Sequence, residues 1–259
     1  MSSLVPLDTQ LARSISDQVL AVMDRKDHWA YPSLTRPGLS RAQLLEHFRH
    51  ENAVFVRDFP ILLARALGLT PPIEEVRRAL AENIYEEQTG ELSRTAAHPE
   101  LFLRMMEGLG LSRAQFAVAG EEAWLLPEAR AYRDFLREGS ATGPWQAAVA
   151  LMTLWVEGSV NERAELAGTF VRRRGEAAIA AHPLVVHYGC PTSAMTLARA
   201  HGDIEGSHRG DAWRIVIGHT LDAATAEIVV DRCSQACALW HSYRDAVADR
   251  MGLRRERAA

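Results

Sequence analysis

The chain has 259 residues, of which 47% are apolar and 24% are charged, a composition typical of a soluble globular protein. The acidic side chains outnumber the basic ones by 33 to 29, which gives a net charge of -4. This balance provides no broad basic field, so we expect no nucleic-acid partner.

Apolar residues recur at helical spacing from the start of the chain. A first helix is predicted from about Asp8 to Lys26. Ser40 is expected to cap a second helix that runs to about Leu67, with a kink at Pro60. The Pro71–Pro72 pair then opens a third helix, from Ile73 to about Ser93.

Proline and glycine also mark the later helices. The pattern predicts helices from His98 to Gly108 or Gly110, from Pro127 to Gly139, after Pro144, from Glu165 to Arg174 and across His201 to His208. The segment from about Asp211 to Met251 is either one long helix or two helices broken near Gly218. No segment alternates like a strand. We therefore predict one all-α domain over residues 1–259, a bundle of seven or more helices.

The cysteines and the apolar runs indicate the compartment. Cys190, Cys233 and Cys237 cannot all pair and form no C-x-x-C motif, which favours a reducing cytoplasm. The N-terminus shows no basic segment followed by an apolar core, so no signal peptide is expected. The longest apolar run, 147–156, is much shorter than the roughly 20 residues that span a bilayer, so no membrane association is expected.

One stretch carries two imidazoles and a carboxylate at helical spacing. His201, Glu205 and His208 stand at i, i+4 and i+7, within roughly 60° of one another on a helix. Such a face suits a metal like iron or manganese. A polar, solvated face with two histidines is the alternative, and the rest of the chain must decide between them.

A di-metal site in a helical bundle needs roughly four carboxylates and two or more histidines, from several helices. Glu157 follows an all-round apolar stretch, and a carboxylate on a core helix requires a partner. The alternative is a helix end that emerges into solvent, as Gly158 and Asn161 suggest. We favour Glu157 as a ligand. The chain has one Glu-x-x-His pair where ferritin-like sites have two, which disfavours a ferritin-like site.

A second acidic region precedes His98. Glu87 lies eleven residues before His98, three helical turns, although Pro99 indicates that the helix breaks between them. Glu86 and Glu91 are the alternative acids. Two of these three carboxylates are expected to be solvated.

In this order the residues resemble the haem-oxygenase-like di-iron oxidases, within the wider fold family of thiaminase-type and pyrroloquinoline-quinone-synthase-type proteins. That group shows Asn-x-x-x-Glu, a ligand histidine, a glutamate on a later core helix, and a His-x-x-x-(Asp/Glu)-x-x-His helix. The matching residues here, within a similarity that spans about residues 40 to 215, are Asn83 with Glu87, His98, Glu157, His201, Glu205 and His208. The Trp155–Ser159 and His187–Gly189 segments also resemble the family.

The resemblance implies a haem-oxygenase-like bundle that binds two Fe(II) ions and reacts with O2. The metal ligands that it implies are Glu87, His98, Glu157, His201, Glu205 and His208, with Glu87 and Glu157 as the catalytic carboxylates. It does not imply haem, because no proximal-histidine pattern stands near the N-terminus. The early histidines, His28, His47 and His50, are expected on polar faces.

The sequence departs from the family at several positions. Glu205 stands where Asp is usual, and Glu87 is further from His98 than in the decarboxylase members. Members that oxygenate nitrogen carry a further carboxylate from an early helix. Glu51 and Asp58 are the candidates for it, but Arg57 occupies a position where the pattern expects an acid, so a seventh ligand stays open.

The resemblance implies an O2-dependent oxygenase for a small amine or amino-acid-like molecule, which we expect to carry out N-oxygenation in a biosynthetic pathway. We expect a cytoplasmic homodimer with an external electron donor. Desaturation, C–C cleavage or decarboxylation at the same di-iron site are alternatives. A metal-free thiaminase-type or quinone-synthase-type enzyme would instead use a cysteine nucleophile or a basic pocket. A non-catalytic partner-binding bundle would leave the six metal-type residues unexplained.

Overall fold

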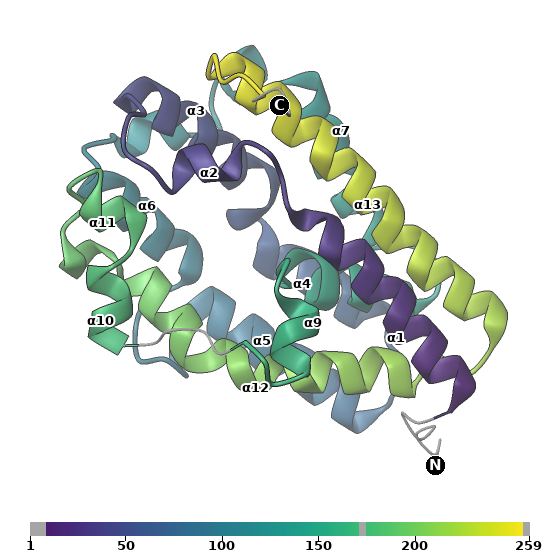
Figure 1. The fold of residues 1–259 in the computed structure, drawn as a ribbon. Coiled ribbons are helices and arrows are strands. Elements are labelled where there is room, and N and C mark those ends of the chain that lie inside the picture. The colour runs from purple at the N-terminus through teal and green to yellow at the C-terminus, as the bar shows by residue number, and fades with distance from the viewer. Residues whose placement is uncertain (1–8, 171–174, 256–259) are drawn as a thin grey trace.

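The computed structural model describes residues 9–170 and 175–255, with only the backbone of residues 203–209 inside helix α12. Every regular element in these ranges is helical, which confirms the all-α prediction (Figure 1). The α-helices are α1 (Gln10–Met23), α2 (Tyr31–Leu34), α3 (Arg41–Glu51), α4 (Phe59–Leu69), α5 (Glu74–Thr89), α6 (His98–Gly108), α7 (Pro127–Gly139), α8 (Trp145–Val149), α9 (Glu162–Leu166), α10 (Gly175–Ala180), α11 (Pro183–Val186), α12 (Thr196–Gly218) and α13 (Ala223–Arg250).

Local capping chemistry determines where the helices begin. Ser40 accepts a hydrogen bond from the backbone N–H of Gln43, and the Gln43 side chain accepts one from Ser40 N–H, so the two form a capping box before α3. Pro99 and Pro127 lie in the first turns of α6 and α7, where the missing N–H is not needed. These are the starts that the sequence predicts.

The expected kink at Pro60 is wrong. The segment is not one bent helix, because α3 passes into a π-helix at Asn52–Val56 and the chain turns at Arg57 and Asp58. Pro60 then lies in the first turn of the separate helix α4. A second π-helix, Ala150–Val156, ends directly before Glu157. Such widened turns are rare and often mark functional sites.

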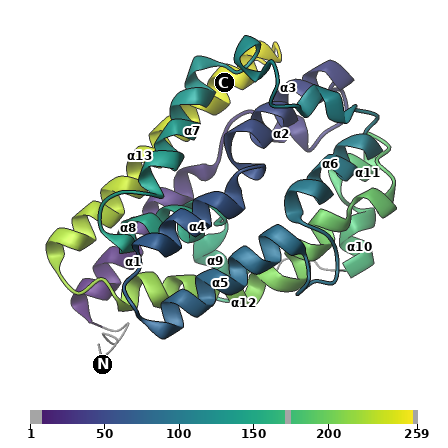
Figure 2. The same ribbon diagram turned by 180° about the vertical axis from the view of Figure 1, so that it is seen from behind.

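The long helices form two groups. Helix α13 packs along α1 and α7, on one side of the molecule (Figure 1). On the other side α12 lies beside α5 and α6, which Figure 2 shows from behind. The break near Gly218 is confirmed, because α12 ends at this residue and α13 starts at Ala223. None of the helices in the described ranges is long and apolar enough to cross a bilayer.

The buried apolar residues form two clusters. The larger lies among α1, α4, α7, α8, α13 and the C-terminal half of α12, and the smaller among α3, α6, α11 and the start of α12. On α12, Ala200 belongs to the smaller cluster and Ala212 to the larger. His201 therefore stands where α12 passes between the clusters, and polar side chains gather at this junction.

The expectation that His28, His47 and His50 lie on polar faces is wrong, because all three are buried. His28 contacts Asp245 at 3.1 Å, and His50 Nδ1 lies 2.7 Å from the Glu46 carbonyl oxygen. Buried imidazoles are stable here because such partners satisfy their nitrogens.

Candidate metal centre

A tight reversal of the chain brings the end of α5 beside the start of α6. Gly90 ends α5 in the left-handed conformation, with φ +70°. A Cβ atom on Gly90 would lie 2.3 Å from the carbonyl oxygen of Ala96, so only glycine fits. Because the chain folds back here, Glu87 and His98 meet although the helix breaks between them.

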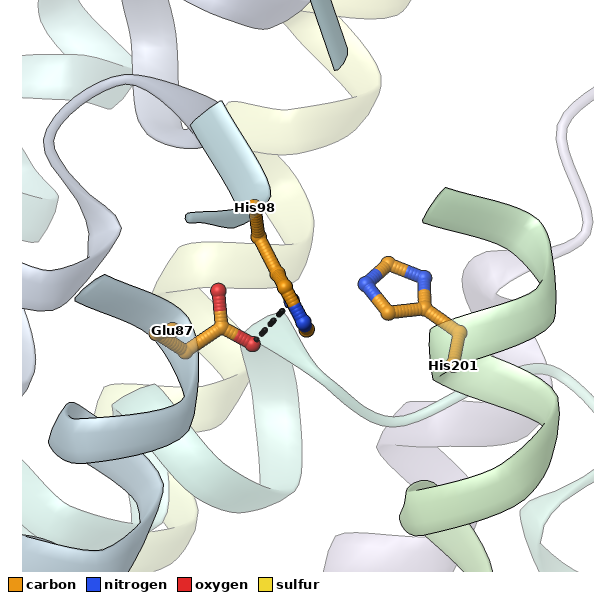
Figure 3. A group of neighbouring side chains, drawn as sticks. All are labelled: Glu87, His98 and His201. Atoms are coloured by element: carbon orange, nitrogen blue, oxygen red, sulfur yellow. Dashed lines mark ion pairs between the residues drawn. The ribbon is translucent and has the colours of Figure 1, made fainter. Parts of the chain in front are cut away.

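Three side chains from three helices converge at this point. Glu87 comes from α5, His98 begins α6, and His201 lies on α12, and Figure 3 shows that all three point toward one another. Each offers one ligand atom, and these atoms all lie within 4.8 Å of one another. The rings of His98 and His201 meet edge to face with their centroids 5.0 Å apart. His98 is buried, and the other two are partly buried.

The contact between Glu87 and His98 suits a shared metal ion. Glu87 Oε1 lies 2.8 Å from His98 Nδ1 (Figure 3), yet this buried nitrogen has no partner that meets hydrogen-bond geometry among the described residues. A carboxylate and an imidazole nitrogen that lie close together without a hydrogen bond can both coordinate the same cation. One carboxylate with two imidazoles is the donor set of non-haem Fe(II) sites. The residues present therefore fit iron.

The other nitrogen of His98 contacts Glu86, which the sequence left among the solvated alternatives. Glu86 is buried, with 2% of its surface exposed, and its Oε1 lies 3.1 Å from His98 Nε2. Its Oε2 accepts hydrogen bonds from the backbone N–H groups of Leu92 and Ser93, at 2.9 and 3.0 Å. Glu91 is exposed. Of the three acids, one rather than two is solvated.

The two carboxylates control the charge of the ring between them. Burial alone would lower the pKa of His98, but the contacts with Glu87 and Glu86 outweigh it and raise this pKa above its usual value. For Glu86, burial opposes ionisation, but the hydrogen bonds from Ser93 and His98 outweigh it and lower the pKa. The centre is thus a locus of negative charge that attracts a cation.

The side chain of Glu157 is held against the face of α5 that carries Glu87. The Asn83 side-chain amide donates a hydrogen bond of 2.7 Å to Glu157 Oε1. Asn83 and Glu87 are at i and i+4 on α5, so their Cβ atoms are about 5–6 Å apart. Lys26 Nζ donates to the carbonyl oxygens of Trp155 and Gly158, both at 2.6 Å, and fixes the backbone around Glu157. Among the described residues, Glu157 does not join the 4.8 Å group.

The remaining sequence candidates divide into two kinds. The side chains of Glu205 and His208 lie outside the described part of α12, so their assignment as ligands stays a prediction. Glu51 contacts Arg244 at 2.7 Å and His47 at 3.5 Å. Asp58 contacts Arg57 and Arg137. Both acids are neutralised by arginine, which is unlike the environment of a metal ligand.

A small pocket with a cavity volume of about 40 Å³ opens to solvent beside Glu157. Its walls are mainly apolar, and its described lining includes three carboxylates and no lysine, arginine or histidine. The lining residues are Ala79, Leu80, Glu82, Asn83, Val149, Thr153, Glu157, Asp211, Ala212 and Ile215. The pocket therefore combines an apolar wall with negative charge.

The cysteines lie in the two apolar clusters. Cys190, Cys233 and Cys237 are all buried. Burial raises the pKa of all three thiols, and that of Cys233 to about 12. The reactive form of cysteine is the thiolate, so these environments disfavour a nucleophilic role.

Comparison with known proteins identifies the fold. A TenA homologue from Pseudomonas syringae pv. tomato str. DC3000 is similar at 15% identity and a TM-score of 0.67, over 96% of this chain and 99% of that one. A domain of unknown function with a haem oxygenase-like fold from Shewanella denitrificans OS217 is similar at 14% identity and a TM-score of 0.65, over 99% and 98%. The predicted haem-oxygenase-like bundle is thereby confirmed.

The sequence comparisons indicate the family. No curated protein matches the sequence. One family model, described as that of an iron-containing redox enzyme, matches residues 46–241, a range that includes Glu87, His98, Glu157 and His201. Since this range covers most of the chain, the protein belongs to the family of iron-containing redox enzymes.

Proposed function

We propose that the protein is a non-haem di-iron oxygenase that uses O2 to oxidise the nitrogen of a small amine or amino-acid-like molecule. The observation that carries this proposal is the convergence of Glu87, His98 and His201, from three helices, within 4.8 Å. Their donor set is one that Fe(II) prefers, and the chain belongs to an iron-containing redox family.

In this proposal Glu87, His98 and His201 hold one iron ion. Glu157 with Glu205 and His208 would hold the other, the last two on the basis of their spacing on α12. When bound, the two ferrous ions supply the electrons with which O2 is first reduced. The protein contributes position: Asn83 holds the carboxylate of Glu157, and Lys26 holds the backbone that carries it.

The pocket beside Glu157 supports a cationic substrate. Glu82 lines it together with Glu157, and these two carboxylates attract an ammonium group. Asp211 also lines the pocket and is paired with Arg214 at 3.1 Å. The apolar wall, which includes Leu80 and Ile215, suits an aliphatic chain. Oxidation requires the nitrogen lone pair, so the ammonium proton must first move to a carboxylate such as Glu82, which is exposed and exchanges protons with water.

The proposed reaction needs an external electron donor. Conversion of an amine to a hydroxylamine inserts one oxygen atom of O2 between nitrogen and hydrogen. The second oxygen atom leaves as water and takes up two electrons and two protons. Each turnover thus consumes one O2 and one two-electron equivalent of reductant.

The direct test is O2 consumption by the iron-loaded protein with a reductant and a panel of aliphatic diamines and amino acids. The proposal predicts an amine-dependent uptake of O2 and a product that contains one atom from ¹⁸O2 bound to nitrogen. Glu157→Gln should abolish the uptake, whereas Glu138→Gln, on the exposed side of α7, should not. Products of desaturation, C–C cleavage or decarboxylation would contradict N-oxygenation but would be consistent with a di-iron site. Absence of substrate-dependent O2 uptake would reject the oxygenase.

A further inference from the structure

His98 is contacted by two neighbouring carboxylates, one at each ring nitrogen. Glu87 Oε1 lies 2.8 Å from Nδ1, and Glu86 Oε1 lies 3.1 Å from Nε2. Residues 86 and 87 are successive positions of α5, about 100° apart around the helix axis. The imidazole at the start of α6 is therefore clamped between two side chains of one helix.

The two carboxylates are not equivalent. Glu86 is already satisfied by protein donors, because the backbone N–H groups of Leu92 and Ser93 bind Oε2 and the His98 ring binds Oε1. Glu87 belongs to the group in which the ligand atoms of His98 and His201 converge. Glu86 is thus bound into the reversal between α5 and α6, and Glu87 faces the metal position.

We infer that Glu86 is a positioning residue that keeps the proton of His98 on Nε2 and presents the Nδ1 lone pair to the metal. The inference rests on the proposed metal centre. A neutral imidazole carries one proton, and an ionised carboxylate can only accept a hydrogen bond. Glu87 is also a carboxylate, but only the Glu86 contact has hydrogen-bond geometry, whereas Nδ1 has no such partner among the described residues. This difference assigns the proton to Nε2 and leaves Nδ1 as the ligand atom. Carboxylates in this position orient ligand histidines and increase their basicity.

The first test uses the iron-free protein with ¹⁵N-labelled histidine. Two-bond ¹⁵N–¹H correlation spectra, recorded at alkaline pH where the ring is neutral, show which nitrogen of His98 carries the proton. We expect Nε2–H in the wild-type chain. A proton on Nδ1 would overturn the inference without the need for any variant.

The substitution Glu86→Gln provides the matched perturbation. The side-chain amide oxygen of this variant can still accept from Leu92 and Ser93, but its NH2 group faces Nε2, which must then become an acceptor. The proton should move to Nδ1, where Glu87 accepts it. The control Glu91→Gln removes the same charge from an exposed position nearby and should leave the tautomer unchanged. An unchanged tautomer in Glu86→Gln would also overturn the inference.

Anaerobic Fe(II) titration supplies the second readout. Glu86→Gln should weaken iron binding roughly 10- to 100-fold at unchanged stoichiometry, as other outer carboxylates do. If Glu86→Gln instead loses one iron ion, as we expect for Glu87→Gln, Glu86 is itself a ligand and its positioning role is overturned. Affinity equal to that of Glu91→Gln would overturn it as well. If the wild-type chain binds no iron, the proposed function fails, and the tautomer spectra still decide the role of Glu86.

Discussion

The side-chain amide of Asn83 donates a 2.7 Å hydrogen bond to Oε1 of Glu157, a residue 74 positions later in the chain. This bond joins α5 to the residue that follows the π-helix Ala150–Val156. Glu157 is thereby directed toward the same helix that carries Glu87. Asn83 connects the pocket to the candidate metal centre.

Replacement of Asn83 by alanine should release Glu157. The loss of a hydrogen bond to a charged group should lower the free energy of unfolding by about 1.5–3 kcal/mol, and Fe(II) should bind more weakly. Urea unfolding and anaerobic Fe(II) titration measure the two effects. Gln88→Ala, on the exposed side of α5, is the control and should change neither. Iron affinity equal to that of the wild type would show that the bond does not position a ligand.

Gly90→Ala should disrupt the meeting of Glu87 and His98. Its control is Gly120→Ala, because both glycines have positive φ, +70° for Gly90 and +83° for Gly120. Only at Gly90 would the added Cβ clash with the backbone, since it would lie 2.3 Å from the carbonyl oxygen of Ala96. The left-handed conformation alone should cost about 1 kcal/mol at either site. The steric clash should add about 1–3 kcal/mol at Gly90 and reduce iron binding. Equal destabilisation of the two variants in urea would contradict this account of the reversal.

Acid should destabilise the protein through His47. Burial lowers the pKa of this imidazole from 6.5 to about 4, against the opposing charge of Glu51. Between these values the unfolded chain binds a proton that the folded chain does not, so stability falls as the pH drops through 6.5 toward 4. From pH 7 to pH 5 this residue should account for about 2 kcal/mol of lost stability.

The test compares urea unfolding of the iron-free wild type and His47→Gln at pH 7 and pH 5. The variant should lose about 2 kcal/mol less between the two pH values, since its side chain does not titrate. His187→Gln, at an exposed histidine, should keep the wild-type pH dependence. If His47→Gln also keeps it, the histidine is already protonated in the folded protein.

The cysteines should be dispensable for activity. Because burial raises the pKa of Cys190, Cys233 and Cys237, the thiolate fraction at neutral pH is small. Cys190→Ala should retain iron binding and O2 uptake, and iodoacetamide should modify the native thiols slowly. Loss of activity in Cys190→Ala at wild-type iron content would revive the metal-free, thiol-based alternative.

Much of the fold is readable from the sequence because local chemistry defines it. Ser40, Pro99 and Pro127 mark helix starts through capping and the missing proline N–H, and the structure places helices there. The break at Gly218 follows similarly. The π-helices could not be predicted, because an apolar stretch such as 150–156 shows the same composition in either helical form. The π-helix at Asn52–Val56 could not be predicted for the same reason, so the sequence predicts a kink at Pro60 where the chain starts a new helix.

The candidate site was only partly predictable. The order of Glu87, His98 and His201 identified residues that the fold brings together, although spacing alone could not show how the chain reverses at Gly90. The sequence names Glu86 as an alternative to Glu87 but does not predict its burial, because adjacent positions of a helix cannot be ranked without knowledge of the neighbouring loop. The burial of His47, which the sequence places on a polar face, depends on residues as distant as Arg244, almost 200 positions later. The i, i+4 pair with Glu51 was a usable signal.

The central claim is that side chains from α5, α6 and α12 jointly hold iron. Anaerobic Fe(II) titration of the wild type and of His98→Ala, His201→Ala and His187→Ala tests it most directly. We predict about two ions per chain for the wild type and the exposed control His187→Ala. Each of the other two variants should lose about one ion. Stoichiometry that does not change in His98→Ala and His201→Ala, or a wild-type chain that binds no iron, would contradict the account.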